Sequence, residues 1–213
     1  LAFANSTEYG LTLGLQSLDE TEINYWKNKM EAGNLYINRG ITGAIVRRQP
    51  FGGMKRSAFG AGIKAGGPNY VSCFVQFIDN RKKTITDRNE LFRQVRQNFA
   101  KAWDDEFGVE RDVSHIVGEQ NTFRYLPVKS VAIRVQDSDP LVDIILTFYA
   151  AVYTVDKVVI SVSKTYPEMD VLRKETADYG KVILIQTEEE FVAEMEKYER
   201  IRTCSADLSD AIY

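Results

Sequence analysis

Apolar and polar residues follow two different patterns along the chain, and the change falls near residue 119. Beyond it, short apolar runs rich in Val and Ile alternate with stretches in which apolar residues recur at helical spacing. The pattern predicts strands at 128–135, 157–163, 181–186 and 201–204, and helices at 140–154, 167–179 and 187–198. Strand and helix repeated in this order favour a parallel sheet covered by helices, which is a Rossmann-like α/β fold.

The first part of the chain is less regular. Residues 11–15 predict a short strand, and Ser17 with Glu20 three residues later matches a capping box. Apolar residues follow at helical spacing, which predicts a helix over residues 18–32 with Gly33 as its C-terminal cap.

Two further strands and one long helix are predicted before residue 110. Residues 35–38 are typical of a buried strand, and residues 71–78 are apolar on both faces, so a strand there needs a partner. Asp87 and Glu90 match a helix start, and apolar residues line one face as far as Gly108.

Charge differs between the two parts of this 213-residue chain. Residues 1–78 hold eight Lys or Arg and five Asp or Glu, or +3, whereas the remainder holds 19 and 25, or −6. We therefore expect a domain at 1–78, a linker helix at 79–110 and a second domain at 111–213. The net charge of −3 indicates no general attraction to nucleic acid or to anionic membranes.

Nine of the 14 glycines lie between Gly33 and Gly67, among Ile, Val, Phe and Tyr residues. This mixture indicates an ordered loop in which backbone approaches a ligand or another backbone closely. Pro50 favours an extended residue before it, and Gly52 and Gly53 allow a tight turn that presents the Phe51 ring to a pocket. A tight turn with a core Phe is the alternative interpretation.

A second part of this loop has the features of an anion site. The backbone N–H groups of Gly43 and Ala44 suit a small nest, and Arg47 and Arg48 add positive charge. A solvated basic loop is equally compatible with these residues.

The sequence contains no self-sufficient catalytic set. His115 is the only histidine and is predicted at the surface or in a linker, and Cys73 lies among apolar residues, as an inert buried thiol does. Cys204 has no neighbouring base, and no metal-ligand spacing is present. Two cysteines far apart, without a membrane-spanning run or signal peptide, favour a cytoplasmic protein.

The second part does not have the sequence of a nucleotide site. The turn after its first strand, residues 136–140, is acidic and lacks glycine, so it would oppose a pyrophosphate. We interpret this part as a structural or docking unit.

Several motifs in the first 78 residues resemble the C-terminal part of an aldehyde dehydrogenase catalytic domain. They lie at residues 4–7, 9–12, 33–39 and 49–53. Residues 41–46 and 64–70 resemble, more narrowly, the L-glutamate γ-semialdehyde (1-pyrroline-5-carboxylate) dehydrogenase branch, including forms fused to proline dehydrogenase.

The resemblance implies roles for single residues. Gly43 and Ala44 would bind the substrate carboxylate through their backbone amides, and Phe51 would lie beside the aldehyde and the nicotinamide. Arg47 and Arg48 depart from the small or neutral residues common at these positions, and their role is open.

Other residues are implied as support or as assembly surface. Asn38 would lie beneath the pocket, with Pro50, Gly52 and Gly53 shaping it, and residues 71–78 would form the strand near the surface of a homo-oligomer.

The resemblance also implies what the chain does not contain. The family uses NAD, a Cys nucleophile and a Glu, all expected upstream of residue 1, and neither Cys73 nor Cys204 matches that nucleophile. We therefore expect a fragment of a proline-catabolic dehydrogenase that acts on a small aldehyde and is inactive alone. A noncatalytic oligomerisation or active-site cover module is the alternative.

The second part carries a weaker resemblance, through residues 118–122 and 124–164, to the aldehyde-dehydrogenase-like extra domain of bifunctional proline-utilisation proteins. That domain is noncatalytic and helps to cover the active site. Because it usually continues further, truncation at both ends is expected.

Overall fold

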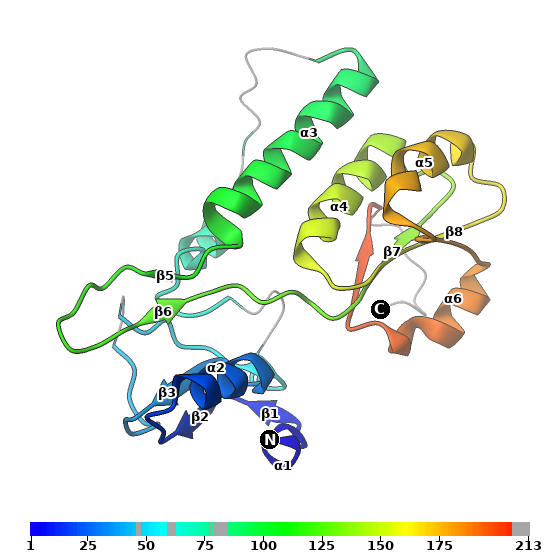
Figure 1. The fold of residues 1–213 in the computed structure, drawn as a ribbon. Helices are drawn as coiled ribbons and strands as arrows, with labels where there is room; N and C mark the ends of the chain where they lie inside the picture. Colours follow the sequence, from blue (N-terminus) through cyan, green and yellow to red (C-terminus); the bar gives the residue numbers. More distant parts are fainter. Residues whose placement is uncertain (46–47, 59–62, 77, 79–84, 206–213) are drawn as a thin grey trace. The chain divides into compact units, whose positions relative to one another are not determined.

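The computed structural model describes residues 1–213 except 46–47, 59–62, 77, 79–84 and 206–213. The chain divides into two compact units (Figure 1). Unit 1 comprises Leu1–Asn80 and Glu110–Phe123, and unit 2 comprises Arg81–Val109 and Arg124–Tyr213. The domain bounds expected from the sequence, at residues 78 and 110, stay a prediction.

Unit 2 is built on a parallel sheet of four strands. The sheet contains β7 (Val131–Val135), β8 (Val158–Val162), β9 (Ile183–Ile185) and β10 (Arg200–Thr203), in the order β10-β7-β8-β9. Every neighbouring pair is parallel, which confirms the predicted parallel α/β arrangement. All five residues of β7 are buried, as expected for a strand that is covered on both faces.

The predicted helices of unit 2 are also present. They are α4 (Leu141–Thr154), α5 (Met169–Thr176) and α6 (Glu188–Glu194), with short 3-10 turns after α5 and α6. Figure 1 shows α4 and α5 together on one side of the sheet and α6 apart from them. The Thr187 side chain and Glu190 form the expected capping box at the start of α6.

The long helix α3 (Arg88–Ala102) belongs to unit 2 and continues through a π turn, Trp103–Phe107, to Gly108. Asp87 caps its start by accepting hydrogen bonds from two backbone N–H groups. Phe92 is only 2% exposed and joins the hydrophobic core of this unit. Helix α3 therefore packs into the hydrophobic core of unit 2.

Unit 1 consists of small elements joined by loops. Its helices are α1 (Ala2–Asn5) and α2 (Glu20–Lys29). Its strands pair as β1 (Tyr9–Gly10) with β4 (Met54–Lys55), β2 (Thr12–Leu15) with β3 (Asn34–Ile37), and β5 (Arg111–Asp112) with β6 (Thr122–Phe123). Only the β2–β3 pair is parallel among these three, and α2 connects its strands.

The start and end of α2 differ from the prediction. Asp19, not Ser17, is the N-cap, because its carboxylate accepts hydrogen bonds from the backbone N–H groups of Thr21 and Glu22. A carboxylate also interacts favourably with the positive end of the helix dipole. The helix ends at Lys29, before an extended Met30, so Gly33 is not its cap.

The strand predicted at residues 71–78 is wrong. The structure has a 3-10 helix at Tyr70–Phe74, and no strand includes any described residue of this segment. Val71 and Phe74 are 67% and 74% exposed. An apolar strand needs a neighbour for its backbone groups, and the turn-forming residues 66–69 lead the chain into a helical turn instead.

Among the helices in the described part of the chain, none combines the length and apolar character that crossing a membrane requires.

Candidate functional site

The backbone on both sides of Phe51 is held by hydrogen bonds. Phe51 exchanges two backbone hydrogen bonds with Ala65, at N···O distances of 3.0 and 3.1 Å. The Asn34 side chain holds the flanking residues: its Nδ2 donates to Pro50 O at 3.1 Å, and its Oδ1 accepts from Gly52 N at 3.2 Å. These four bonds fix the position from which the Phe51 ring projects.

The sequence pattern predicted no separate role for Asn34. A carboxamide can donate and accept at once, so it can bridge an N–H and a C=O of the same loop. The sequence feature that could have indicated this role is an Asn directly after Gly33, at the start of a predicted strand and close to a Gly-rich loop.

The glycines permit close approach of backbone segments, as the sequence predicted. A Cβ on Gly33 would lie 1.8 Å from Gly52 O, and a Cβ on Gly53 would lie 2.3 Å from the Ser57 Cβ. Neither distance is possible for a real side chain, so glycine is required at both positions. The Phe51 turn is thus packed directly on the start of β3.

Lys64 completes the packing behind this turn. Its Nζ donates to Gly33 O, and its Cγ lies 3.0 Å from where a Cβ on Gly52 would be. Burial lowers the pKa of Lys64 to about 8. The ammonium group is therefore part of the packed loop and not a solvated surface charge.

The Gly43–Ala44 loop is exposed and is connected to β3 at one point. Gly43 has a φ of +83°, and its carbonyl oxygen accepts a hydrogen bond from the Tyr36 hydroxyl at 3.1 Å. Within the described chain, the N–H groups of Gly43 and Ala44 donate no hydrogen bond. Arg47 lies outside the described residues, and Arg48 is exposed.

Asn38 lies at the end of β3 with a φ of +57°. Its side chain accepts from Ser17 N at 2.9 Å and donates to Ser17 O at 2.7 Å. Asn38 therefore holds the segment between β2 and α2.

The polar residues of β3 thus connect three parts of unit 1. Asn34 and Tyr36 are two residues apart, a spacing that places side chains on one face of a strand, and Asn38 follows directly after the strand. Their partners are the Phe51 turn, the Gly43 carbonyl and Ser17. The structure brings Pro50, Gly52 and Phe51 together around Asn34, while Gly43 is bound by Tyr36 and Asn38 is bound to Ser17.

The cysteines and the histidine provide no catalytic set. Cys73 is exposed, so the predicted buried thiol is wrong; the segment that contains it does not form a paired strand. Burial raises the pKa of the Cys204 thiol to about 11, and its Sγ lies 4.0 Å from Thr147 Oγ1. His115 is exposed, as predicted.

No group of three metal-ligating side chains occurs among the residues that the structure describes. The carboxyl edge of the unit 2 sheet also does not fit a dinucleotide. The Asp137 carboxylate accepts hydrogen bonds from the Ser163 hydroxyl and, at 2.6 Å, from the Thr165 hydroxyl, and these bonds lower the pKa of Asp137. A pyrophosphate there would meet an ionised carboxylate that already accepts hydrogen bonds from two hydroxyls.

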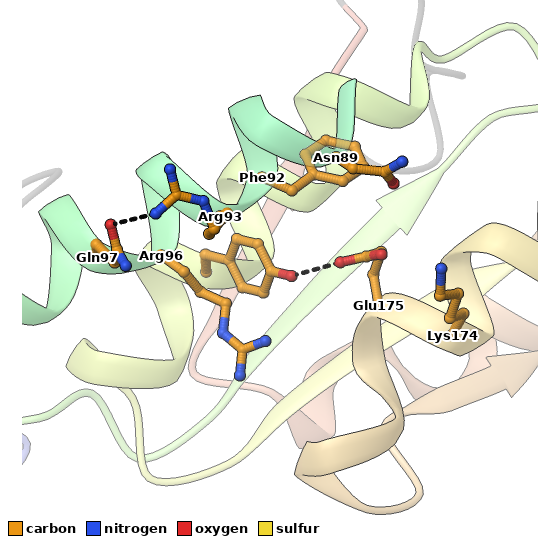
Figure 2. A pocket seen from close by; sticks show the side chains of 8 residues that line it. Asn89, Phe92, Arg93, Arg96, Gln97, Lys174 and Glu175 are labelled. Atoms are coloured by element: carbon orange, nitrogen blue, oxygen red, sulfur yellow. Dashed lines mark hydrogen bonds between the residues drawn. The ribbon is translucent and has the colours of Figure 1, made fainter. Parts of the chain in front are cut away.

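A cavity of about 430 Å³ lies among α3, α4 and α5 in unit 2 (Figure 2). It is lined by Asn89, Phe92, Arg93, Arg96, Gln97, Tyr149, Lys174 and Glu175. Arg93 is bonded to Glu90 and Gln97, and the Tyr149 hydroxyl donates to Glu175 at 2.9 Å. These bonds engage Arg93, Tyr149 and Glu175 within unit 2, and the cavity lies at a junction between three of its helices.

Comparison with known proteins gives a consistent result for the first unit. Residues 1–78 match the aldehyde dehydrogenase family. The 1-pyrroline-5-carboxylate dehydrogenases of Bacillus cytotoxicus and Bacillus mycoides are each 50% identical to this chain over 76 residues. These alignments cover 36% of this chain and 14% of each relative.

A solved structure is similar over a longer range. The structure of Proline Utilization A from Corynebacterium freiburgense matches with a TM-score of 0.59 and 36% sequence identity. The match covers 86% of this chain, so it extends beyond residue 78 into unit 2, and it covers 21% of that structure. The chain thus spans about a fifth of this solved relative.

Because Gly33 lies so close to Gly52 O, adding one methyl group at Gly33 should strongly lower the stability of unit 1. We expect Gly33→Ala to destabilise unit 1 by at least about 2 kcal/mol, because its Cβ would overlap Gly52 O. Gly40→Ala is the matched control, since a Cβ there meets nothing within 4 Å. Urea unfolding followed by Trp26 fluorescence, with Trp103 replaced by Phe, measures the difference. Equal midpoints for the two variants would contradict the packing.

The two hydrogen bonds of Asn34 predict a local effect on the Phe51 turn. In Asn34→Ala, we expect the Gly52 amide to exchange with solvent at least about tenfold faster, because it loses its acceptor. The Ile160 amide, which donates to Val182 O in the other unit, is the internal control. Unchanged exchange at Gly52, measured by NMR, would show that Asn34 does not hold the turn.

The cysteine environments predict unequal reactivity. At pH 8, Cys73 should react readily with a disulfide reagent, whereas Cys204 should react on the order of 100-fold more slowly because of its raised pKa. Cys73→Ser should remove the fast phase, and Cys204→Ser should leave it unchanged. A fast phase that survives Cys73→Ser would contradict the assignment.

Proposed function

We propose that this chain, whose residues 1–78 match the aldehyde dehydrogenase family, is part of an NAD-dependent L-glutamate γ-semialdehyde dehydrogenase. The observation that carries the proposal is the 50% identity to 1-pyrroline-5-carboxylate dehydrogenases over the segment that contains β3 and the Phe51 turn. In this proposal the chain provides one wall of the aldehyde pocket.

Gly43 and Ala44 are the residues proposed to bind the substrate carboxylate. Their N–H groups are exposed and donate to no acceptor in the described chain, so they are available to an anion. The Tyr36 hydroxyl restrains the loop through Gly43 O. Glutamate γ-semialdehyde has a carboxylate remote from its aldehyde, and this carboxylate could accept hydrogen bonds from the N–H groups of the loop.

Phe51 is proposed to lie against the aldehyde carbon. Its backbone is fixed by Ala65 on one side and by Asn34 through the flanking residues on the other. A fixed aromatic side chain restricts the orientations of a small substrate and keeps water away from one of its faces. Both effects favour a single attack geometry.

The overall reaction converts the aldehyde, NAD⁺ and water to the carboxylate and NADH, with release of protons. In the family a Cys thiolate is the nucleophile towards the aldehyde carbon, and NAD⁺, when bound, would supply the hydride acceptor. We assign neither Cys73 nor Cys204 to the attack and no residue of this chain to NAD⁺ binding. The proposal places these groups in a part of the complete protein outside this chain.

A second proposed role, assembly, is favoured by exposed apolar residues near the end of unit 1. Val71, Phe74 and Ile78 are 67%, 74% and 81% exposed. Isolated apolar side chains are common at surfaces, but several in one short segment suit contact with another chain. This role, as an oligomer surface of the same dehydrogenase or as a noncatalytic cover, is compatible with a substrate-binding wall.

A chimera tests the proposed function. Residues 1–78 replace the matching segment of the Bacillus cytotoxicus 1-pyrroline-5-carboxylate dehydrogenase, and NADH formation from the semialdehyde is measured. We expect turnover, and we expect Phe51→Ala to lower kcat/KM at least about tenfold by loss of substrate orientation. The chain by itself should show no turnover.

Two results would overturn this proposal. One is a chimera that unfolds cooperatively and binds NAD⁺ but does not oxidise the semialdehyde. The other is turnover that Phe51→Ala leaves unchanged.

A further inference from the structure

The β5–β6 hairpin in unit 1 is organised by one carboxylate. Asp112 Oδ1 accepts from Ser114 N at 2.8 Å, from Ser114 Oγ at 2.7 Å and from His115 N at 3.3 Å, and its Oδ2 accepts from Asn121 N at 2.8 Å. These bonds, the Ser114 hydroxyl first, lower the pKa of Asp112 to about 2. The carboxylate therefore stays ionised at neutral pH and fixes the backbone at Asn121.

The side chain of Asn121 is oriented by the same hairpin. Its Nδ2 donates to Ser114 Oγ at 3.1 Å and to Glu119 Oε2 at 3.2 Å. Since both acceptors lie within the hairpin, the opposite end of the amide, Oδ1, is directed elsewhere. It accepts a hydrogen bond from Gln49 Nε2 at 3.3 Å, 72 residues earlier in the chain.

Gln49 lies two residues before Phe51. The residue between them, Pro50, has a ring that fixes its φ angle, and its carbonyl oxygen accepts from Asn34. Because the φ angle of Pro50 is fixed, few backbone torsions between Gln49 and Phe51 can absorb a displacement of Gln49. Gln49 Oε1 is buried without a partner among the described residues, so this side chain stays in place despite an unfavourable contribution.

We infer that Gln49 and Asn121 are positioning residues, through which the hairpin at 110–123 fixes the amino-terminal side of the Phe51 turn. This inference rests on the proposed function for its catalytic consequence, because Phe51 faces the aldehyde only in that proposal. The hydrogen-bond arrangement itself is independent of it. The pocket wall is then held from two directions, by Asn34 and by the hairpin.

Hydrogen exchange of the 213-residue chain tests the positioning. In Gln49→Ala and in Asn121→Ala, the Phe51 amide should exchange about fivefold faster or more, the effect of losing about 1 kcal/mol of local hydrogen bonding. The double variant should exchange no faster than the faster single variant, because both changes remove the same bond. Gln120→Ala, at an exposed neighbouring position, should have no effect.

Kinetics in a second chimera, in which all 213 residues of this chain replace the matching segment of the Bacillus cytotoxicus dehydrogenase, distinguish positioning from general stability. Asn121→Ala should raise KM for the semialdehyde about fivefold or more while KM for NAD⁺ changes less than twofold, because only the substrate wall moves. A merely structural role would lower the amount of active enzyme and leave both KM values unchanged.

The outcomes separate the two proposals. Phe51 exchange within twofold of the parent chain in both single variants overturns the positioning inference, whatever the activity. Equal changes in the two KM values also overturn it. A parent chimera that unfolds cooperatively and binds NAD⁺ but is inactive overturns the proposed function, while faster Phe51 exchange in the variants still supports the positioning contact.

Discussion

The alternation of side chains along β3 is the constraint on which unit 1 depends. Asn34 and Tyr36 lie on one face of the strand, Asn38 follows its end, and each forms hydrogen bonds to a different loop or turn. A shift of one residue in the pairing of β2 with β3 would turn Asn34 and Tyr36 to the opposite face and would displace Asn38. The register of this short parallel pair therefore determines where the Phe51 turn, the Gly43 loop and the start of α2 lie.

The glycines at positions 33 and 52 allow the Phe51 turn to pack against β3. Lys64 covers the contact while donating to Gly33 O. The loop is therefore ordered by packing and hydrogen bonds with little regular secondary structure. Composition alone does not distinguish such a loop from a linker, but glycine interleaved with Ile, Phe and Tyr does.

Unit 2 was predictable from the sequence because its determinants are local and periodic. Apolar runs defined β7 and β8, and Thr187 with Glu190 defined the start of α6. In unit 1 the sequence offers two possible N-caps for α2, because both Ser17 and Asp19 have a Glu three residues later. Asp19 is the cap in the structure. The segment 71–78 has the composition of a strand, but such a composition forms a strand only where a partner strand is available. Its first residues form a 3-10 helix instead.

The contacts of the candidate site depend on long-range geometry that no local pattern encodes. The family resemblance suggested Phe51 and Gly43 as candidate residues, but the side chains that hold the segment before Phe51 follow from the fold. Asn34 donates to Pro50, 16 residues away, and Asn121 accepts from Gln49, 72 residues away. The sheet of unit 2 illustrates the converse. Its parallel order suits nucleotide binding, yet Asp137 engages the hydroxyls at its carboxyl edge, so the side chains and not the sheet determine that no pyrophosphate fits there. In both units, therefore, the fold places the backbone, and a few side-chain hydrogen bonds determine which groups are available to bind a ligand.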